Sequence, residues 1–420
     1  MANDVLTFTD RGIYCAAGDF FIDPWRPVDR ALITHGHADH ARDGHGAYLA
    51  TDLAAPVMRA ALDRADVDGG GLDLYIFGNV LRAGQGQLVP RQAALQAGIP
   101  ENIDGYAVDM VCASSMMSIM NGATMIKAGE ADLILAGGTE SMSGAGYYLD
   151  SGARWGYTLS PGGEQLQDIM QRDGLSDPNS GEAMGEQTER LCEEHDISRQ
   201  ELDEIAAMSQ QRAAEATEEG RFDDEITPVE YETRSGPETL ESDEGIRPGT
   251  TAEGLSNLSP AFTKDGVLTA GNSSQISDGA AAVLLASEEA IEAHGLTPLA
   301  KVHRGGWSAR ESWRFPEAPI PAVHNVLEST GTELADYDLF ENNEAFAINN
   351  ILFHRELDVP YDRLNVHGGA IALGHPIGAS GTRITVTLLH ALRQHDGTMG
   401  MASICHGTGG GVALAIERTT

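Results

Sequence analysis

Two stretches of this chain, far apart in the sequence, repeat one pattern, and the repeat constrains the fold more than any other feature. In each stretch a potentially reactive residue, Cys112 in the first and His375 in the second, precedes a long run of small and apolar residues. Such a run is typical of a buried helix, and an apolar strand-like segment follows it in both cases. Alternating helices and strands favour an α/β architecture. The repeat therefore predicts two similar α/β halves that face each other.

The rest of the pattern divides the chain into four parts. A helix expected at 52–66 and buried strands expected at 73–80 and 131–138 belong to the first half. An acidic, turn-rich stretch then interrupts the α/β rhythm, which returns at Asn272. We expect a layered sandwich of two halves with an inserted loop domain. The predicted parts are an atypical N-terminal segment 1–51, a first half 52–142, an inserted loop domain 143–271 and a second half 272–420.

The charge of the chain limits its partners. It carries 63 acidic and 27 basic residues, a net charge of -36, and lysine occurs only at Lys127, Lys264 and Lys301. Such an acidic surface repels nucleic-acid phosphates, so we expect no nucleic-acid partner. Self-repulsion at this charge weakens the fold unless salt screens it, and the screening length falls to about 3 Å in molar salt. The composition therefore indicates a halophilic protein from a salt-rich cytoplasm, although an ordinary acidic protein would share the sign of the charge.

The four cysteines are widely spaced, which does not suggest a disulfide framework. No signal peptide or apolar stretch of membrane-spanning length is recognisable, so we expect a cytoplasmic location and no membrane partner.

Four residues lie where chemistry is expected. Cys112 lies between a strand-like run and a helix, whose N-terminus would lower the pKa of a thiol; a buried, inert cysteine fits that position equally well. His375 lies in the Gly-rich GHPIGASG, where it could act as a base or donate to an oxyanion. Cys405 lies in CHGTGGG, whose glycines let backbone N–H groups approach a ligand. Asn343 follows a strand in NNEAFA and could instead be a helix cap.

Together these motifs resemble the thiolase family. The resemblance runs from about Asp52 to the C-terminus. It rests on GNVLRAGQGQLVPRQAAL, DMVCASSMMS, ADLILAGGTESMS, RPGTT, LSPAFTKDGVLTAGNSSQISDGAAAVLL, NEAFA, GGAIALGHPIGASG and the terminal C-x-G-x-G-x-G-V-A pattern. It implies the thiolase fold and acyl transfer between coenzyme A thioesters, by Claisen condensation or thiolysis, with no permanently bound cofactor and coenzyme A as substrate.

The resemblance also implies roles for single residues. Cys112 matches the cysteine that becomes acylated, His375 the histidine that activates it, and Cys405 the second cysteine, which moves a proton on the donor. Asn343 matches the asparagine that holds a water in one oxyanion hole with His375. The N–H groups of Cys112 and Gly407 match a second oxyanion hole.

Further positions match coenzyme A and acyl contacts in the family. Ser274 corresponds to a serine on the pantetheine arm and Arg247 to a basic residue near the nucleotide. Four apolar residues fall where the family lines its tunnel, although plain core packing explains them as well; they are Met184, Phe262, Phe315 and Phe346. Departures from the family at Ser115, Ala183, His367, His406 and Thr408 leave the acyl-chain preference open.

The N-terminal segment does not fit this family. It resembles the opening of a metallo-β-lactamase-fold hydrolase, because His35, His37, Asp39 and His40 form H-x-H-x-D-H, which is a strong metal-ligand pattern. We expect the site to be incomplete, since no histidine occurs between His45 and His195. The strand that normally opens the family is not recognisable, and residues 28–35, VDRALITH, could replace it as a central strand.

Three interpretations remain at this point. An active thiolase is favoured, with a short-chain acetoacetyl-forming enzyme slightly preferred over a longer-chain 3-ketoacyl-CoA enzyme. A condensing ketosynthase is disfavoured because those relatives replace the second cysteine, which is present here as Cys405. The alternatives are a thiolase-like protein impaired by its N-terminus and a metal-dependent hydrolase. The family also implies a homodimer or homotetramer.

Overall fold

The computed structural model describes residues 49–155, 166–233 and 236–419, together with four short strands nearer the N-terminus. These four strands pair in the order β1-β2-β3-β4 and form a sheet of their own. Their bounds are β1 (Leu6–Phe8), β2 (Ile13–Cys15), β3 (Phe20–Ile22) and β4 (Ala31–Leu32).

The first half is built on a four-stranded sheet with the order β12-β7-β5-β6. Strand β5 is parallel to both of its neighbours, and β12 is antiparallel to β7. Every residue of β7 is buried, as the long apolar run predicts for a strand covered on both faces. The strands are β5 (Leu74–Gly78), β6 (Asp104–Val108), β7 (Leu133–Ser141) and β12 (Asp278–Ala286).

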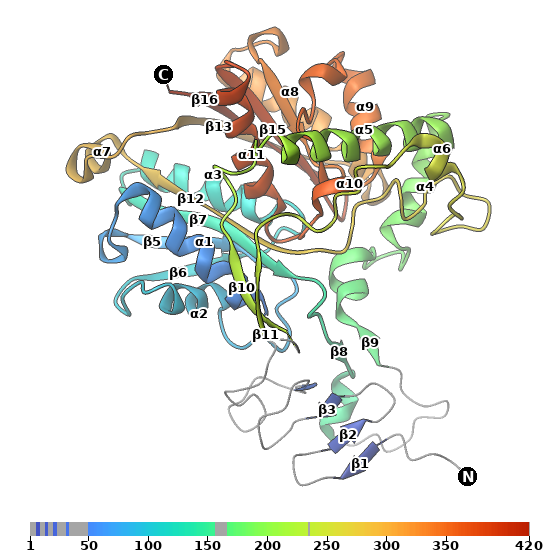
Figure 1. Ribbon diagram of the computed structural model, residues 1–420, viewed down its shortest axis with the longest axis horizontal. Helices are drawn as coiled ribbons and strands as arrows, with labels where there is room; N and C mark the ends of the chain where they lie inside the picture. Colours follow the sequence, from blue (N-terminus) through green and yellow to red (C-terminus); the bar gives the residue numbers. More distant parts are fainter. Residues whose placement is uncertain are drawn as a thin grey trace.

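Helices cover both faces of this sheet (Figure 1). The side chains of β5 alternate between them: Tyr75 and Phe77 pack with α1 and α2, whereas Ile76 packs with α3. Helix α1 contains Pro56 within its second turn. The bounds are α1 (Leu49–Ala65), α2 (Val89–Gln96) and α3 (Ser114–Lys127).

The second half repeats this plan with the order β13-β16-β15-β14. Strands β14 and β15 are parallel, β16 is antiparallel to β15, and β13 is antiparallel to β16. A single bridge from Phe340 to Leu364 occupies the place that β6 has in the first half. The elements are β13 (Ala300–Ala309), β14 (Leu339–Asn342), β15 (Met399–His406), β16 (Gly410–Arg418), α8 (Pro319–Thr330), α9 (Ala347–Leu357), α10 (Ala370–Leu373) and α11 (Ser380–Gln394).

The two halves meet along α3 and α11. These helices contact each other and lie between the two sheets (Figure 1), which makes the core a five-layered stack of helices and sheets. One apolar cluster joins them: Met116 and Ile119 of α3 lie with Ile384 and Leu388 of α11. The residues that precede both helices are thereby brought to one region at the interface.

The acidic central stretch forms a layer on this core. Helix α5 carries a Ser198 cap with a reciprocal Glu201 contact, and its buried face packs on α9 and α10. The strands β10 and β11 pair with each other as an antiparallel hairpin. The elements of this layer are β8 (Tyr147–Tyr148), β9 (Gln167–Asp168), α4 (Met184–Glu194), α5 (Arg199–Glu218), β10 (Val229–Thr233), β11 (Gly236–Leu240) and α6 (Ala252–Ser256), with a 3-10 turn at Ser151–Trp155 and a π-helical turn at Met170–Leu175. Outside it lie α7 (Glu288–His294), which follows β12, and 3-10 turns at Gly69–Gly71, Ser312–Glu317, Leu334–Asp336 and Tyr361–Arg363.

The prediction that residues 28–35 supply a central strand is wrong where the structure describes them. Ala31–Leu32 pairs with β3 in the separate sheet, and β5 pairs directly with β7 over five residues, which leaves no central gap. Comparison of the halves shows why: β13 lies at the edge of its sheet, beyond β16, and the first half has no counterpart beyond β12 among the described strands. The unfilled place is therefore an edge.

No helix in the described part of the chain is long and apolar enough to cross a membrane. The candidate metal ligands His35, His37, Asp39 and His40 lie outside the described residues, so their metal motif stays a prediction.

Candidate active site

Cys112 lies in a tight turn between β6 and α3. The preceding residue, Val111, has a φ of 49°, a left-handed conformation that is unfavourable for a β-branched side chain. Ser114 stabilises the turn: its hydroxyl accepts from the Met110 N–H at 2.8 Å and donates to the Val111 carbonyl at 2.6 Å. The strained turn places the Cys112 thiol at the N-terminal end of α3, where the helix leaves backbone N–H groups free.

The Cys112 side chain is buried, and burial raises the pKa of its thiol to about 12. A hydrogen bond from the Gly407 N–H acts in the opposite direction, as does the N–H of Cys112 itself. These two N–H groups are the pair that the family resemblance matches to an oxyanion hole. The resting residue is a neutral thiol, so a nucleophilic role for Cys112 would require a base to take its proton.

His375 can serve as that base in only one tautomer. The Ser380 hydroxyl donates to the Pro376 carbonyl at 2.9 Å, so its oxygen accepts from Nδ1–H of His375, 2.6 Å away. Nε2 is then unprotonated. Burial, together with the charge of Arg383, lowers the pKa of His375 to about 3, which keeps the ring neutral near pH 7.

Asn343 shares this centre with His375. Its side-chain Nδ2 lies 3.4 Å from Nε2 of His375, and both residues are buried. The Oδ1 atom of Asn343 is buried without a hydrogen-bond partner in the structure. A polar atom in that condition commonly pairs with water or a ligand. Oδ1 of Asn343 is therefore available to accept a hydrogen bond from a water beside His375.

Cys405 reaches the same region from β15. Its thiol is fully buried, and burial raises its pKa, with a further rise from the nearby Cys112. Asn349 of α9 donates to Cys405 Sγ at 3.4 Å, a contact that favours the thiolate. The chain then turns through Thr408 and Gly409, both with positive φ, which presents the Gly407 N–H to Cys112.

Comparisons with known proteins agree on one family. The chain matches the family description "Thiolase, N-terminal domain" over residues 40–289 and "Thiolase, C-terminal domain" over residues 296–418. It is 62% identical to an acetyl-CoA acetyltransferase of Synechocystis sp. over 88% of this chain and 94% of that protein. The chain belongs to the thiolase family. The predicted α/β thiolase fold and acyltransferase activity are confirmed.

Solved thiolase structures resemble this one closely. The Bacillus anthracis acetyl-CoA acetyltransferase superposes with a TM-score of 0.85 at 39% identity, over 88% of this chain and 93% of that chain. Human mitochondrial 3-ketoacyl-CoA thiolase in complex with CoA gives 0.84 at 40% identity, over 88% and 92%.

Four predicted tunnel residues of this thiolase cluster near Gly407. Phe346 packs against Phe262 and Phe315, with ring centroids 5.8 and 6.2 Å apart. The sulfur of Met184 lies 3.8 Å from where a side chain on Gly407 would begin. Phe315 is fully buried, which makes it a support behind the cluster; Phe262 is only half-buried.

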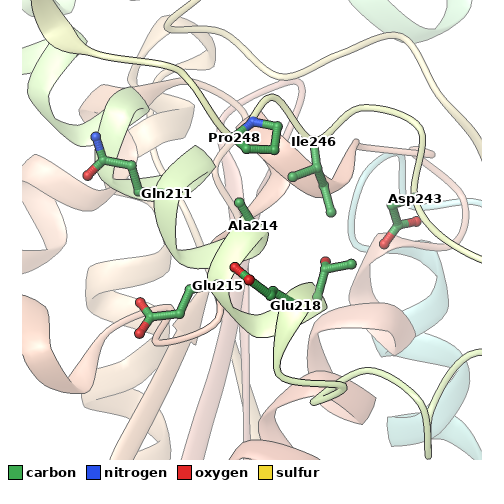
Figure 2. A pocket seen from close by; sticks show the side chains of 8 residues that line it. Gln211, Ala214, Glu215, Glu218, Asp243, Ile246 and Pro248 are labelled. Atoms are coloured by element: carbon green, nitrogen blue, oxygen red, sulfur yellow. The ribbon is translucent and has the colours of Figure 1, made fainter.

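The two polar coenzyme A candidates are each held by a hydrogen bond from the backbone N–H. Ser274 is half-buried, and its N–H donates to the Ala345 carbonyl at 3.0 Å. Arg247 is exposed, and its N–H donates to Gln210 at 2.7 Å. A hollow of about 580 Å³ is lined in part by Ile246 and Pro248, the two neighbours of Arg247 in the sequence. Figure 2 shows the residues that line it. Its acidic lining disfavours phosphate groups; the lining residues are Gln211, Ala214, Glu215, Thr217, Glu218, Asp243, Ile246 and Pro248.

Sequence reasoning missed three polar residues at this site: Ser380, Asn349 and Glu140. Ser380 lies five residues after His375, a spacing that places it in the first turn of the following helix. Asn349 and Glu140 are brought to the site only by the folding of distant segments. No local sequence pattern therefore distinguishes them from ordinary polar residues.

Proposed function

We propose that this thiolase interconverts two molecules of acetyl-CoA with acetoacetyl-CoA and CoA, through an acyl group carried on Cys112. The short-chain preference is supported by the acetyl-CoA acetyltransferase names of the relatives from Synechocystis sp. and Escherichia coli. The observation that carries the proposal is the buried arrangement in which the Cys112 thiol meets the Gly407 N–H and lies within electrostatic reach of Cys405.

Acyl transfer comes first. As the Cys112 sulfur attacks the thioester carbon, Nε2 of His375 takes the thiol proton and holds it until Cys112 is released, while the Cys405 thiol gives its proton to the leaving CoA sulfur. The N–H groups of Cys112 and Gly407 stabilise the oxyanion, and each such donor contributes about 10²–10³ in rate. A neutral Cys112 thiol and a neutral His375 ring suit this order of events, because charge develops only in the transition state. The N–H groups of Cys112 and Gly407 are already directed at the oxygen that gains the charge.

Carbon–carbon bond formation follows. Cys405, left as a thiolate when it protonates the departing CoA, removes a proton from the methyl carbon of the second acetyl-CoA, and the resulting enolate attacks the acyl carbon on Cys112. The protonated Nε2 of His375 donates to the enolate oxygen, and a water that donates one hydrogen to the unpaired Oδ1 of Asn343 donates its other hydrogen to the same oxygen. The Cys112 sulfur then leaves as a thiolate and regains its proton.

Coenzyme A enters this scheme as a substrate, with its pantetheine arm along Ser274 and the Met184–Phe262–Phe346 cluster and its nucleotide near Arg247. Two neighbouring thiolase structures contain CoA, which supports a site of this kind. An exposed arginine is a favourable contact for the nucleotide phosphates in a chain with a net charge of -36. We further propose a cytoplasmic homodimer or homotetramer adapted to high salt.

The test is CoA-dependent cleavage of acetoacetyl-CoA by the purified chain in molar potassium chloride. Cys112→Ala should abolish thiolysis, because no other described group can carry the acyl chain at this position. Cys192→Ala is the matched control: Cys192 is another buried cysteine, but it lies in the core on α4, so its loss should leave the rate within about twofold of wild type.

Activity that survives in Cys112→Ala would refute the assignment of the nucleophile. Cleavage of longer 3-ketoacyl-CoA substrates with none of acetoacetyl-CoA would replace the short-chain proposal by the longer-chain one.

A further inference from the structure

Glu140, near the end of β7, is a fully buried carboxyl group that the mechanism above does not use. Its two carboxyl oxygens accept four hydrogen bonds from nitrogen atoms. Oε1 accepts from the Leu81 N–H at 3.1 Å and from the Asn79 side chain at 3.3 Å, and Oε2 accepts from the N–H groups of Val80 and Gly378, each at 3.1 Å. Every partner is a donor, so only a carboxylate satisfies all four.

The four donors come from both halves of the protein. Three belong to the segment that directly follows β5, in the half that carries Cys112. The fourth, Gly378, belongs to the turn that carries His375, and it lies 238 residues away from Glu140 in the sequence. Glu140 thus connects the two catalytic halves through one buried group.

The His375 turn sits on a surface that has no room for side chains. A Cβ atom on Gly138 would lie 2.1 Å from the Gly378 carbonyl oxygen, and one on Gly78 would lie 2.4 Å from the same atom. On Gly378 itself a Cβ would lie 2.8 Å from Oε2 of Glu140. The turn is therefore seated directly on the strands β5 and β7, with Glu140 as its polar contact.

The helices that follow Cys112 and His375 are joined beside this seat. The Ser115 hydroxyl accepts from the Thr382 N–H at 2.9 Å, and the Thr382 hydroxyl donates to the Ser115 carbonyl at 3.1 Å. A displacement of the His375 turn would therefore change the relation between the base and the nucleophile.

We propose that Glu140 is a positioning residue, which fixes the His375 turn against the Cys112 half and so sets the alignment of base and thiol for acyl transfer. The inference rests on the proposed function for its catalytic consequence. Glu140 acts through its hydrogen bonds and does not touch substrate. A negative charge on Glu140 also raises the pKa of the Cys112 thiol.

The test combines turnover with a reaction that does not require thiolase activity. Glu140→Gln replaces one acceptor oxygen by an amide that faces a donor, and we expect kcat to fall about 10–100-fold with KM nearly unchanged, because a small misplacement of a catalytic group costs up to about 10² in rate. Alkylation of Cys112 by iodoacetamide, followed by mass spectrometry across pH, should shift to lower pH in Glu140→Gln because the nearby charge is gone.

Asp73→Asn is the matched control. Asp73 accepts from the N–H groups of Asp132 and Leu133 at 2.7 and 2.9 Å, and so bridges the same two strands at their opposite ends. This variant should keep both kcat and the alkylation profile. If Glu140→Gln does not fold, Glu140→Asp, which keeps the charge on a shorter side chain, should show the fall in kcat without the shift in alkylation.

A folded Glu140→Gln enzyme with wild-type kcat and a wild-type alkylation profile would overturn the proposal. A wild-type chain without thiolysis would instead count against the proposed function, and the alkylation comparison would still decide whether Glu140 acts on Cys112.

Discussion

At the scale of single residues, burial sets the protonation states on which this site depends. Cys112, Cys405 and His375 are buried together, and burial shifts each pKa toward the neutral form. The sequence identified these residues through their motifs, yet it could not give their protonation states, because those depend on solvent exclusion by distant segments. The tautomer of His375 also depends on the folded structure, because a hydrogen bond with Ser380, in the first turn of α11, determines it.

His367 allows a prediction about pH and stability. It is buried beside His395, with Nε2 atoms 3.2 Å apart, and burial and the neighbouring charge lower its pKa to about 4. As pH falls below about 6.5, the unfolded chain binds a proton that the folded chain does not bind, so the free energy of unfolding decreases. His367→Asn should remove about 1 kcal/mol of the loss between pH 7.5 and 5.5, by this linkage.

Urea unfolding at the two pH values measures this effect. His324→Asn, at an exposed histidine on α8, is the control and should keep the wild-type pH dependence. An identical acid loss in His367→Asn and wild type would show that His367 does not contribute.

At the scale of elements, the apolar periodicity was sufficient for most of the α/β core. The predicted helix 52–66 corresponds to α1, and the predicted strands 73–80 and 131–138 correspond to β5 and β7. The order of strands within a sheet was not accessible, because pairing depends on long-range contacts. That is why a missing central strand was expected where the structure shows a direct β5–β7 pair and, among the described strands, no partner for β12 at the edge of the sheet.

The glycine seat under the His375 turn gives a prediction at this scale. Gly138→Ala would place a methyl group 2.1 Å from the Gly378 carbonyl oxygen and 2.6 Å from Cβ of Ser115, so the turn must move. We expect a loss of about 1–3 kcal/mol or more in the free energy of unfolding, as for other overpacked cores, and a lower kcat. Thermal unfolding and thiolysis measure the two effects.

Gly146→Ala provides the comparison, because its added methyl group would have no neighbour within 4 Å and its φ is not left-handed. If both variants behaved alike, the close contact at Gly138 would not control the position of the turn.

At the scale of the whole molecule, charge is the property that sets this thiolase apart from an average globular protein. The acidic residues outnumber the basic ones by 63 to 27. Many of the arginines are committed to local contacts: Arg199 binds Asp203 at 2.7 Å and Arg314 binds Glu317 at 3.0 Å. These pairs compensate only a small part of the net charge of -36, and the remainder repels itself across the surface.

This repulsion predicts that the fold is stabilised by salt. The screening length, beyond which charges hardly interact, is about 10 Å at 0.1 M and about 3 Å at 1 M ionic strength. Most of the repulsion should therefore disappear between 0.1 and 1 M salt. The unfolding temperature, measured by calorimetry, should rise steeply up to about 1 M potassium chloride and then level off. Caesium chloride at equal ionic strength should act alike, since screening depends on ionic strength and not on the identity of the cation. An unfolding temperature that stays constant from 0.1 to 1 M would contradict an electrostatic cost, and a response to potassium alone would indicate a bound cation.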